Sequence, residues 1–92
     1  MRTNLVSIPC DNGRVIDSNE RRKGFVVSNN TSVDLLLLLA SGMKASPDEH
    51  SLIVKAGTWT HVDIPYTGEV SVYWDGEHVP GDPLACITEL FD

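Results

Sequence analysis

Short runs of strand-forming residues alternate with turn residues along the chain, a pattern typical of an all-β domain. The turn signals include Asn12-Gly13 and the cluster Pro80-Gly81-Asp82-Pro83. The runs predict strands at residues 3–8, 13–17, 23–28, 33–40, 51–55, 58–64, 69–74 and 84–90. Seven or eight short strands at this spacing predict a small antiparallel β-sandwich or barrel.

Two of the runs alternate in the way that half-buried strands do, because successive side chains of a strand point to opposite faces. Residues 58–64 place Trp59, His61 and Asp63 on one side and Thr60, Val62 and Ile64 on the other. Residues 69–74 place Val70, Val72 and Trp74 on a shared face. We expect the apolar faces to close the core.

The run of five leucines at residues 35–39 is also consistent with a short helix, because leucine has good helix propensity. A helix starting there would end within two turns, before Gly42, and is too short to persist unaided. We therefore predict a strand with both faces covered. Leu36 and Leu38 would share one side, and Leu35, Leu37 and Leu39 the other. Residues 43–50, which are polar and contain a proline, are expected to form an exposed loop.

With 92 residues, the chain is expected to form one domain, residues 1–92, in which residues 1–18 are an N-terminal arm or an edge hairpin. A chain of this size buries only about 60–70% of its unfolded surface. No apolar segment approaches the roughly 18 residues of a membrane span, and the first residues lack the apolar core of a signal peptide. We expect synthesis and use in the cytosol.

The net charge of −6 is unevenly distributed along the chain. Residues 1–46 carry six basic and four acidic groups, whereas residues 47–92 carry one basic and nine acidic groups. Arg21, Arg22 and Lys23 form the one short basic run. Because binding to phosphates needs several cations on one face, neither nucleic acid nor an anionic membrane is an expected partner.

No residue pattern predicts an enzyme or a cofactor. His61 and Asp63 could both point to one strand face, but a metal site needs three or more converging ligands, and His50 and His78 lie in expected loops. No nucleophile elbow or phosphate-binding glycine loop is present.

The two cysteines, Cys10 and Cys86, lie outside any metal-binding spacing and are expected to be free. A disulfide between them is the less favoured alternative in a reducing compartment. The aromatic residues Trp59, Tyr66, Tyr73 and Trp74 could form a sugar-stacking surface, but in a domain of this size they more often fill the core or an interface.

Three blocks of the sequence together resemble a group of small virion proteins of tailed phages. Residues 19–30 have the form R-x-G-F-φ-φ-x-N-N, residues 51–57 end in a glycine turn, and residues 66–74 have the form Y-x-G-x-V-S-x-Y-W. Thr88-Glu89 occupies the place of a final T-E pair. The resemblance covers about residues 19–90 and contains no catalytic motif. The chain departs from the group in its leucine run, which is more polar in those proteins.

The resemblance implies a non-enzymatic structural protein of the bacteriophage virion. A capsid decoration (cement) protein that binds the outer head surface and stabilises the shell is favoured. A tail, adaptor or fibre component of the particle and a small carbohydrate-binding module are the alternatives. The implied partner is the major capsid protein or another virion protein.

The expected interface of such a protein is its leucine run, because only one side of that strand can face its own core. The expected interface residues are Leu35, Leu36, Leu37, Leu38, Leu39, Arg21, Arg22 and Lys23. The basic residues would meet acidic groups such as Asp75, Glu77 or Asp82 of a neighbour. A homo-oligomer is expected, with a trimer favoured by the threefold and sixfold positions of a capsid.

Overall fold

The computed structural model of the protein describes residues 2–8, 15–78 and 85–91, and these residues form eight strands. The strands are β1 (Arg2–Ile8), β2 (Val15–Ile16), β3 (Arg22–Asn29), β4 (Asp34–Leu39), β5 (Leu52–Val54), β6 (Thr58–Val62), β7 (Val70–Asp75) and β8 (Ala85–Phe91). Each predicted strand is present, with bounds that differ by a few residues. Among the described residues no helix is long and apolar enough to cross a membrane.

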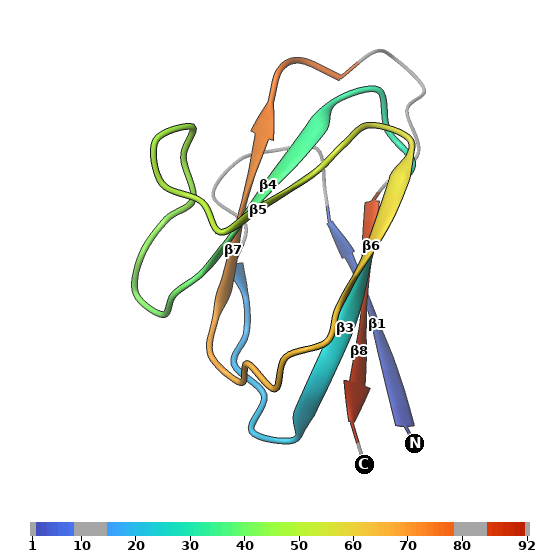
Figure 1. The fold of residues 1–92 in the computed structure, drawn as a ribbon, viewed down its shortest axis with the longest axis vertical. Coiled ribbons are helices and arrows are strands. Elements are labelled where there is room, and N and C mark those ends of the chain that lie inside the picture. The colour runs from blue at the N-terminus through green and yellow to red at the C-terminus, as the bar shows by residue number, and fades with distance from the viewer. Residues whose placement is uncertain (1, 9–14, 79–84, 92) are drawn as a thin grey trace.

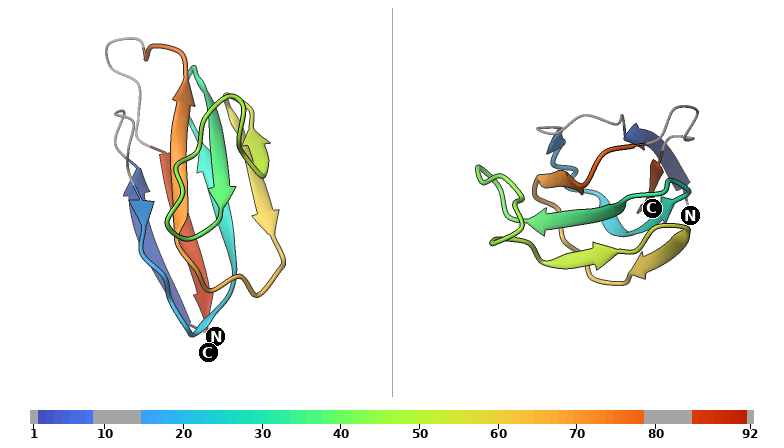
Figure 2. Two further views of the ribbon diagram at one scale, coloured as in Figure 1. Left: turned by 90° about the vertical axis from the view of Figure 1, so that its left-hand side faces the viewer. Right: turned by 90° about the horizontal axis from the view of Figure 1, so that it is seen from above.

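The strands form two antiparallel four-stranded sheets that pack face to face (Figure 1). One sheet has the order β1-β8-β3-β6 and the other the order β2-β7-β4-β5. The predicted all-β sandwich is therefore confirmed. Both chain ends lie at the same end of the sandwich (Figure 2).

The strand pairs are nested, because β4 pairs with β5, β7 with β2, β6 with β3, and β8 with β1. The chain thus resembles one long hairpin rolled up so that successive pairs alternate between the sheets. This arrangement of eight strands is the jelly roll. All pairings other than β4–β5 join residues far apart in the sequence.

The core fills the space between the sheets with inward-facing side chains from both of them. Its centre includes Phe25, Val27, Leu35, Leu37 and Trp74, each no more than 2% exposed. The predicted shared face of β7 is confirmed, since its two valines and its tryptophan are all buried in this core. In β6, Val62 faces the core and Trp59 faces out as expected, but Ile64 lies beyond the end of the strand and is exposed.

The leucine run forms strand β4, as predicted, but the cover on its outer side comes from this chain. Leu36 points away from the core and is nevertheless only 3% exposed. Residues 40–51 fold back over this side of the sheet (Figure 2), where the Ala45 amide donates a 2.5 Å hydrogen bond to Ser71 Oγ. Ala45 itself is buried, so the expectation of a wholly exposed loop is wrong at this residue. The expectation that a second molecule must cover Leu36 is corrected in the same way.

Other expectations concern residues outside the described ranges. These are the turns at Asn12-Gly13 and at Pro80-Gly81-Asp82-Pro83, and the state of Cys10.

At Gly24 the neighbouring strand approaches so closely that a side chain would require the backbone to shift. The pairing of β3 with β8 shifts register between Arg22 and Gly24, and a Cβ atom at Gly24 would lie 2.8 Å from the carbonyl oxygen of Val62. We expect Gly24→Ala to lower the free energy of unfolding by about 1–3 kcal/mol, because strand backbone must move to admit the methyl group. Ser28→Ala in the same strand is the control and should change it by less than about 0.5 kcal/mol. Chemical denaturation measures both, and equal effects would contradict this account.

Candidate functional site

The outer surface of the β1-β8-β3-β6 sheet carries rows of side chains that cross all four strands. One row is Ser7, Cys86, Ser28 and Trp59, and the next is Leu5, Thr88, Val26 and His61. Thr3, Leu90 and Gly24 continue the surface toward the end of the sheet that holds the chain termini. We call these eleven residues the outer face.

The two rows that cross all four strands contain no Asp, Glu, Lys or Arg, although such residues make up 22% of the chain. The exposed Asp63 follows β6 and lies beside Gly24, so the charge-free part of the surface ends at the third row. The two edge strands of the outer face expose large apolar side chains, Trp59 at 69% and Leu5 at 64%. Val26 and Cys86 lie between them and are half-buried. Protein interfaces are depleted of charge at their centre and enriched in aromatic residues, so this surface has the composition of an interface.

The four aromatic residues of the possible sugar-binding surface do not share a surface. Trp74 lies in the core, with its ring edge-on to His78 at a centroid distance of 4.3 Å. Tyr66 donates a hydrogen bond from its hydroxyl group to the carbonyl oxygen of Glu69 and packs against the core. Tyr73 lies on the outside of the opposite sheet. Trp59 is thus separated from the other three.

The basic residues Arg21, Arg22 and Lys23 are adjacent in the sequence, but the fold buries Arg22 and leaves the other two exposed. Arg22 is only 1% exposed, so it offers no surface to a neighbouring molecule, and its expected interface role is corrected. Arg21 and Lys23 remain exposed and line, with Arg2 and Glu20, a shallow depression of about 410 Å³. Arg2 and Arg21 both line this depression, although they belong to segments that are far apart in the sequence.

Arg22 is held by five polar contacts at one end of the sandwich. Its Nε and Nη2 atoms each lie 2.8 Å from Glu89 Oε2. Its remaining donors reach the carbonyl oxygens of Tyr66 at 3.1 Å, Gly68 at 2.8 Å and Asp17 at 2.7 Å. Each N–H group of the guanidinium thus has an acceptor, which is the arrangement that a buried arginine requires.

Glu89 receives hydrogen bonds that stabilise its charged form. Burial alone would raise the pKa of this carboxyl group, but hydrogen bonds from Asn4 and Arg22, together with the charge of Arg22, outweigh it and lower the pKa. The Asn4 side chain donates to Glu89 Oε1 at 2.9 Å. The Arg22–Glu89 pair therefore links β3 and β8 to β1.

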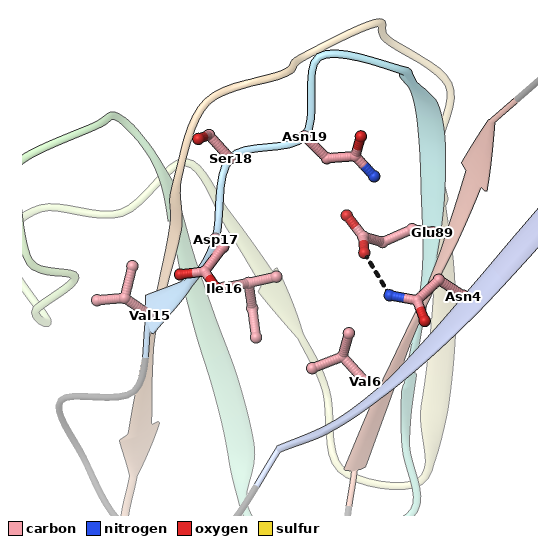
Figure 3. Close-up of a pocket in the computed structure, with 8 residues that line it drawn as sticks. All are labelled: Asn4, Val6, Val15, Ile16, Asp17, Ser18, Asn19 and Glu89. Atoms are coloured by element: carbon pink, nitrogen blue, oxygen red, sulfur yellow. Dashed lines mark hydrogen bonds between the residues drawn. The ribbon is translucent and has the colours of Figure 1, made fainter.

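A pocket of about 300 Å³ opens beside this pair, between the edge strand β1 on one side and β2 with the residues that follow it on the other (Figure 3). Asn4 and Val6 line it from β1, and residues 15–19 line it from the other side. Glu89 closes its inner end, where its carboxylate is already engaged by Asn4 and Arg22.

The residues considered for metal binding are not brought together. Within residues 2–8, 15–78 and 85–91, no group of three or more His, Cys, Asp or Glu side chains could hold a metal ion. His61 lies on the outer face, and Cys86 is a free, half-buried thiol of the same face.

The chain matches no protein-family model, and no curated protein and no solved structure is significantly similar to it.

Sequence reasoning singled out Trp59 but missed the rest of the outer face. The signal was present in the period-two alternation of residues 3–8, 23–28 and 84–90, which places Leu5, Val26 and Thr88 on the side away from the core. The side-by-side arrangement of the three strands could not be read from the alternation.

We expect Glu89→Gln to destabilise the fold strongly. The substitution leaves the buried Arg22 cation without its counter-charge, and breaking a buried pair in this way costs about 3–5 kcal/mol. Asp34→Asn is the control because Asp34 pairs with Lys55 in an exposed ion pair, and it should have a much smaller effect. Urea denaturation compares the two, and similar losses would contradict a central role for Arg22–Glu89.

The lowered pKa of Glu89 also predicts how stability depends on pH. A depressed folded-state pKa stabilises the fold above the ordinary Glu value of about 4.3, and this contribution is lost as the pH falls through the folded-state pKa. The wild-type protein should therefore lose unfolding free energy below about pH 4.3. Because Asp34 also has a lowered pKa, the comparison is with Glu89→Gln, whose loss over the same range should be smaller. If the unfolding free energy falls equally with pH in the wild type and in Glu89→Gln, the pH dependence does not come from Glu89.

Proposed function

We propose that the protein is a non-enzymatic assembly domain that docks its outer face on another protein of a phage particle. The observation that carries this proposal is the outer face itself, in which two rows across four strands carry no charged side chain and Trp59 is exposed at the edge. A monomer in water gains nothing from exposing such a residue, whereas an interface gains a large apolar contact from it.

The assignment to the virion, as a decoration protein of the head, rests on the resemblance of residues 19–90 to small virion proteins. The jelly-roll strand order is compatible with it, since this arrangement recurs in viral capsid domains. Lectin domains and cupins have the same architecture, so the fold alone does not select the function. A tail, adaptor or fibre protein would use the same surface on a different partner.

The separation of the aromatic residues disfavours a carbohydrate-binding module. Stacking on a sugar needs a platform, and Trp59 is the one member of the four considered that is both on the outer face and largely exposed. Protein docking makes use of Leu5 and Val26 as well, which a sugar platform does not require.

The test is cosedimentation of the purified protein with purified heads and, separately, purified tails of the phage that encodes it. We expect saturable binding to heads, and at least about a tenfold weaker binding for Trp59→Glu, because a charge replaces an aromatic anchor at a desolvated contact.

Met43→Glu is the matched control, because Met43 is an exposed apolar residue in the segment that covers the opposite sheet. It adds the same charge and should leave binding unchanged. If the protein binds to tails and not to heads, its partner is a tail protein and the assignment as a head decoration protein is wrong. Binding to neither, or equal binding of the two variants, would overturn docking through the outer face.

A further inference from the structure

We propose that β1 is a dimerisation edge, at which two copies of the chain pair their β1 strands antiparallel and join their β1-β8-β3-β6 sheets into one eight-stranded sheet. The pairing deepens the proposed docking role, on which its biological purpose rests, because it places two outer faces side by side. Its physical basis is independent of that role.

β1 differs from the other edge strands of the sandwich. It is seven residues long and pairs with β8 without a register shift, and no described strand pairs with its other side. Alternate residues of such a strand aim their N–H and C=O groups away from the sheet, where they can pair with another chain. The edge strands of the other sheet, β2 and β5, have only two and three residues.

The two flanks of the sandwich are also unequal. On one flank the edge strands β5 and β6 of the two sheets contact each other. On the other flank, the pocket of about 300 Å³ separates β1 from residues 15–19 (Figure 3). An added strand needs room for the side chains on its inner face, and this pocket provides that room beside β1.

The sequence of β1 is complementary to itself in the antiparallel direction, and this selects a second copy as the occupant. Centring the pair on Leu5 places Leu5 opposite Leu5, and Thr3 opposite Ser7, on the outer side. Thr–Ser is a stabilising cross-strand pair, and contact between the two leucines removes apolar surface from water. The one charged residue of the strand, Arg2, then lies opposite Ile8 and far from its own copy, so no like charges face each other.

In this register each Leu5, which is 64% exposed in the single chain, packs one flank of its side chain against its own copy, and its outward side stays part of the outer face. The symmetry axis is perpendicular to the sheet, so both outer faces point to the same side. A dimer of this kind offers a partner two equivalent docking surfaces, which raises avidity without any new contact. This dimer is an alternative to the trimer that the sequence favours.

The first experiment measures oligomeric mass by sedimentation equilibrium over a range of protein concentrations. We expect a reversible dimer for the wild type and about a tenfold weaker one for Leu5→Lys, because the substitution places like charges directly opposite each other. Ile53→Lys is the control, since Ile53 is an exposed apolar residue of β5, and it should leave the dimer intact. A wild-type monomer or trimer, or equal weakening by both substitutions, would overturn the proposal.

The second experiment tests the register in chains that carry Cys10→Ser and Cys86→Ser. Opposed residues of paired antiparallel strands have Cα atoms about 4.5–5.5 Å apart, within the range of a disulfide. Leu5→Cys should therefore form an intermolecular disulfide under mild oxidation. Thr3→Cys should not, because the two copies of residue 3 lie about four residues apart along the strand. Equal cross-linking of the two variants would overturn the register.

Trp59→Glu separates this inference from the proposed function, because Trp59 lies on β6, at the opposite edge of the same sheet. We expect this variant to remain dimeric while it loses binding to the phage heads. If the wild-type protein is a dimer but binds neither heads nor tails, the docking role alone is overturned. A loss of the dimer in Trp59→Glu would overturn pairing through β1.

Discussion

The buried guanidinium of Arg22 is the contact on which one end of the sandwich depends. It binds Glu89 of β8 and the carbonyl oxygens of Asp17, Tyr66 and Gly68, which belong to the two connections that cross between the sheets at this end. These carbonyl groups lie outside the strand ladders and need a donor wherever they are removed from water. A single side chain supplies that donor to both connections, so the position of each is fixed relative to the other.

At the opposite end, an amide side chain has the corresponding role. Asn29, which is fully buried at the end of β3, donates to the carbonyl oxygens of Val33 and Val54 and accepts hydrogen bonds from Thr31. The nested topology explains why such fixed points are needed. Because nearly all strand pairs join distant parts of the chain, ordering the crossover segments costs conformational entropy that local contacts do not offset. Polar clusters at both ends keep the rolled hairpin in register.

The alternation of apolar residues was sufficient to predict the strands, the inward face of β7 and the inward direction of Val62 in β6, because a strand buried on one side imposes a period of two. It was wrong for Ile64, which lies beyond the end of β6 and is exposed. It was not sufficient for Leu36, which is buried within this chain on the outer side of its sheet, nor for Arg22, whose acceptors lie 5 to 67 residues away. A basic run is most often a solvated surface, and burial of its middle residue depends on a carboxylate and three carbonyl groups that only the folded chain brings together. The outer face could not be predicted for a related reason, since its rows cross four strands from separate parts of the sequence.

The two sheets of the sandwich therefore differ in how their outer surfaces meet water. The leucine-rich sheet carries the more apolar strand, yet residues 40–51 fold over it, and Leu36 gains its burial within one molecule. The other sheet has no comparable segment across it among the described residues, and its outer face keeps Trp59 and Leu5 exposed at opposite edges. A domain of this size buries only part of its apolar surface in its own core. Covering the remaining exposed apolar side chains with another protein surface therefore adds to the stability of the folded state. This asymmetry favours the proposed assembly through the β1-β8-β3-β6 sheet, in which the free edge of β1 and the exposed Trp59 would be two separable contacts.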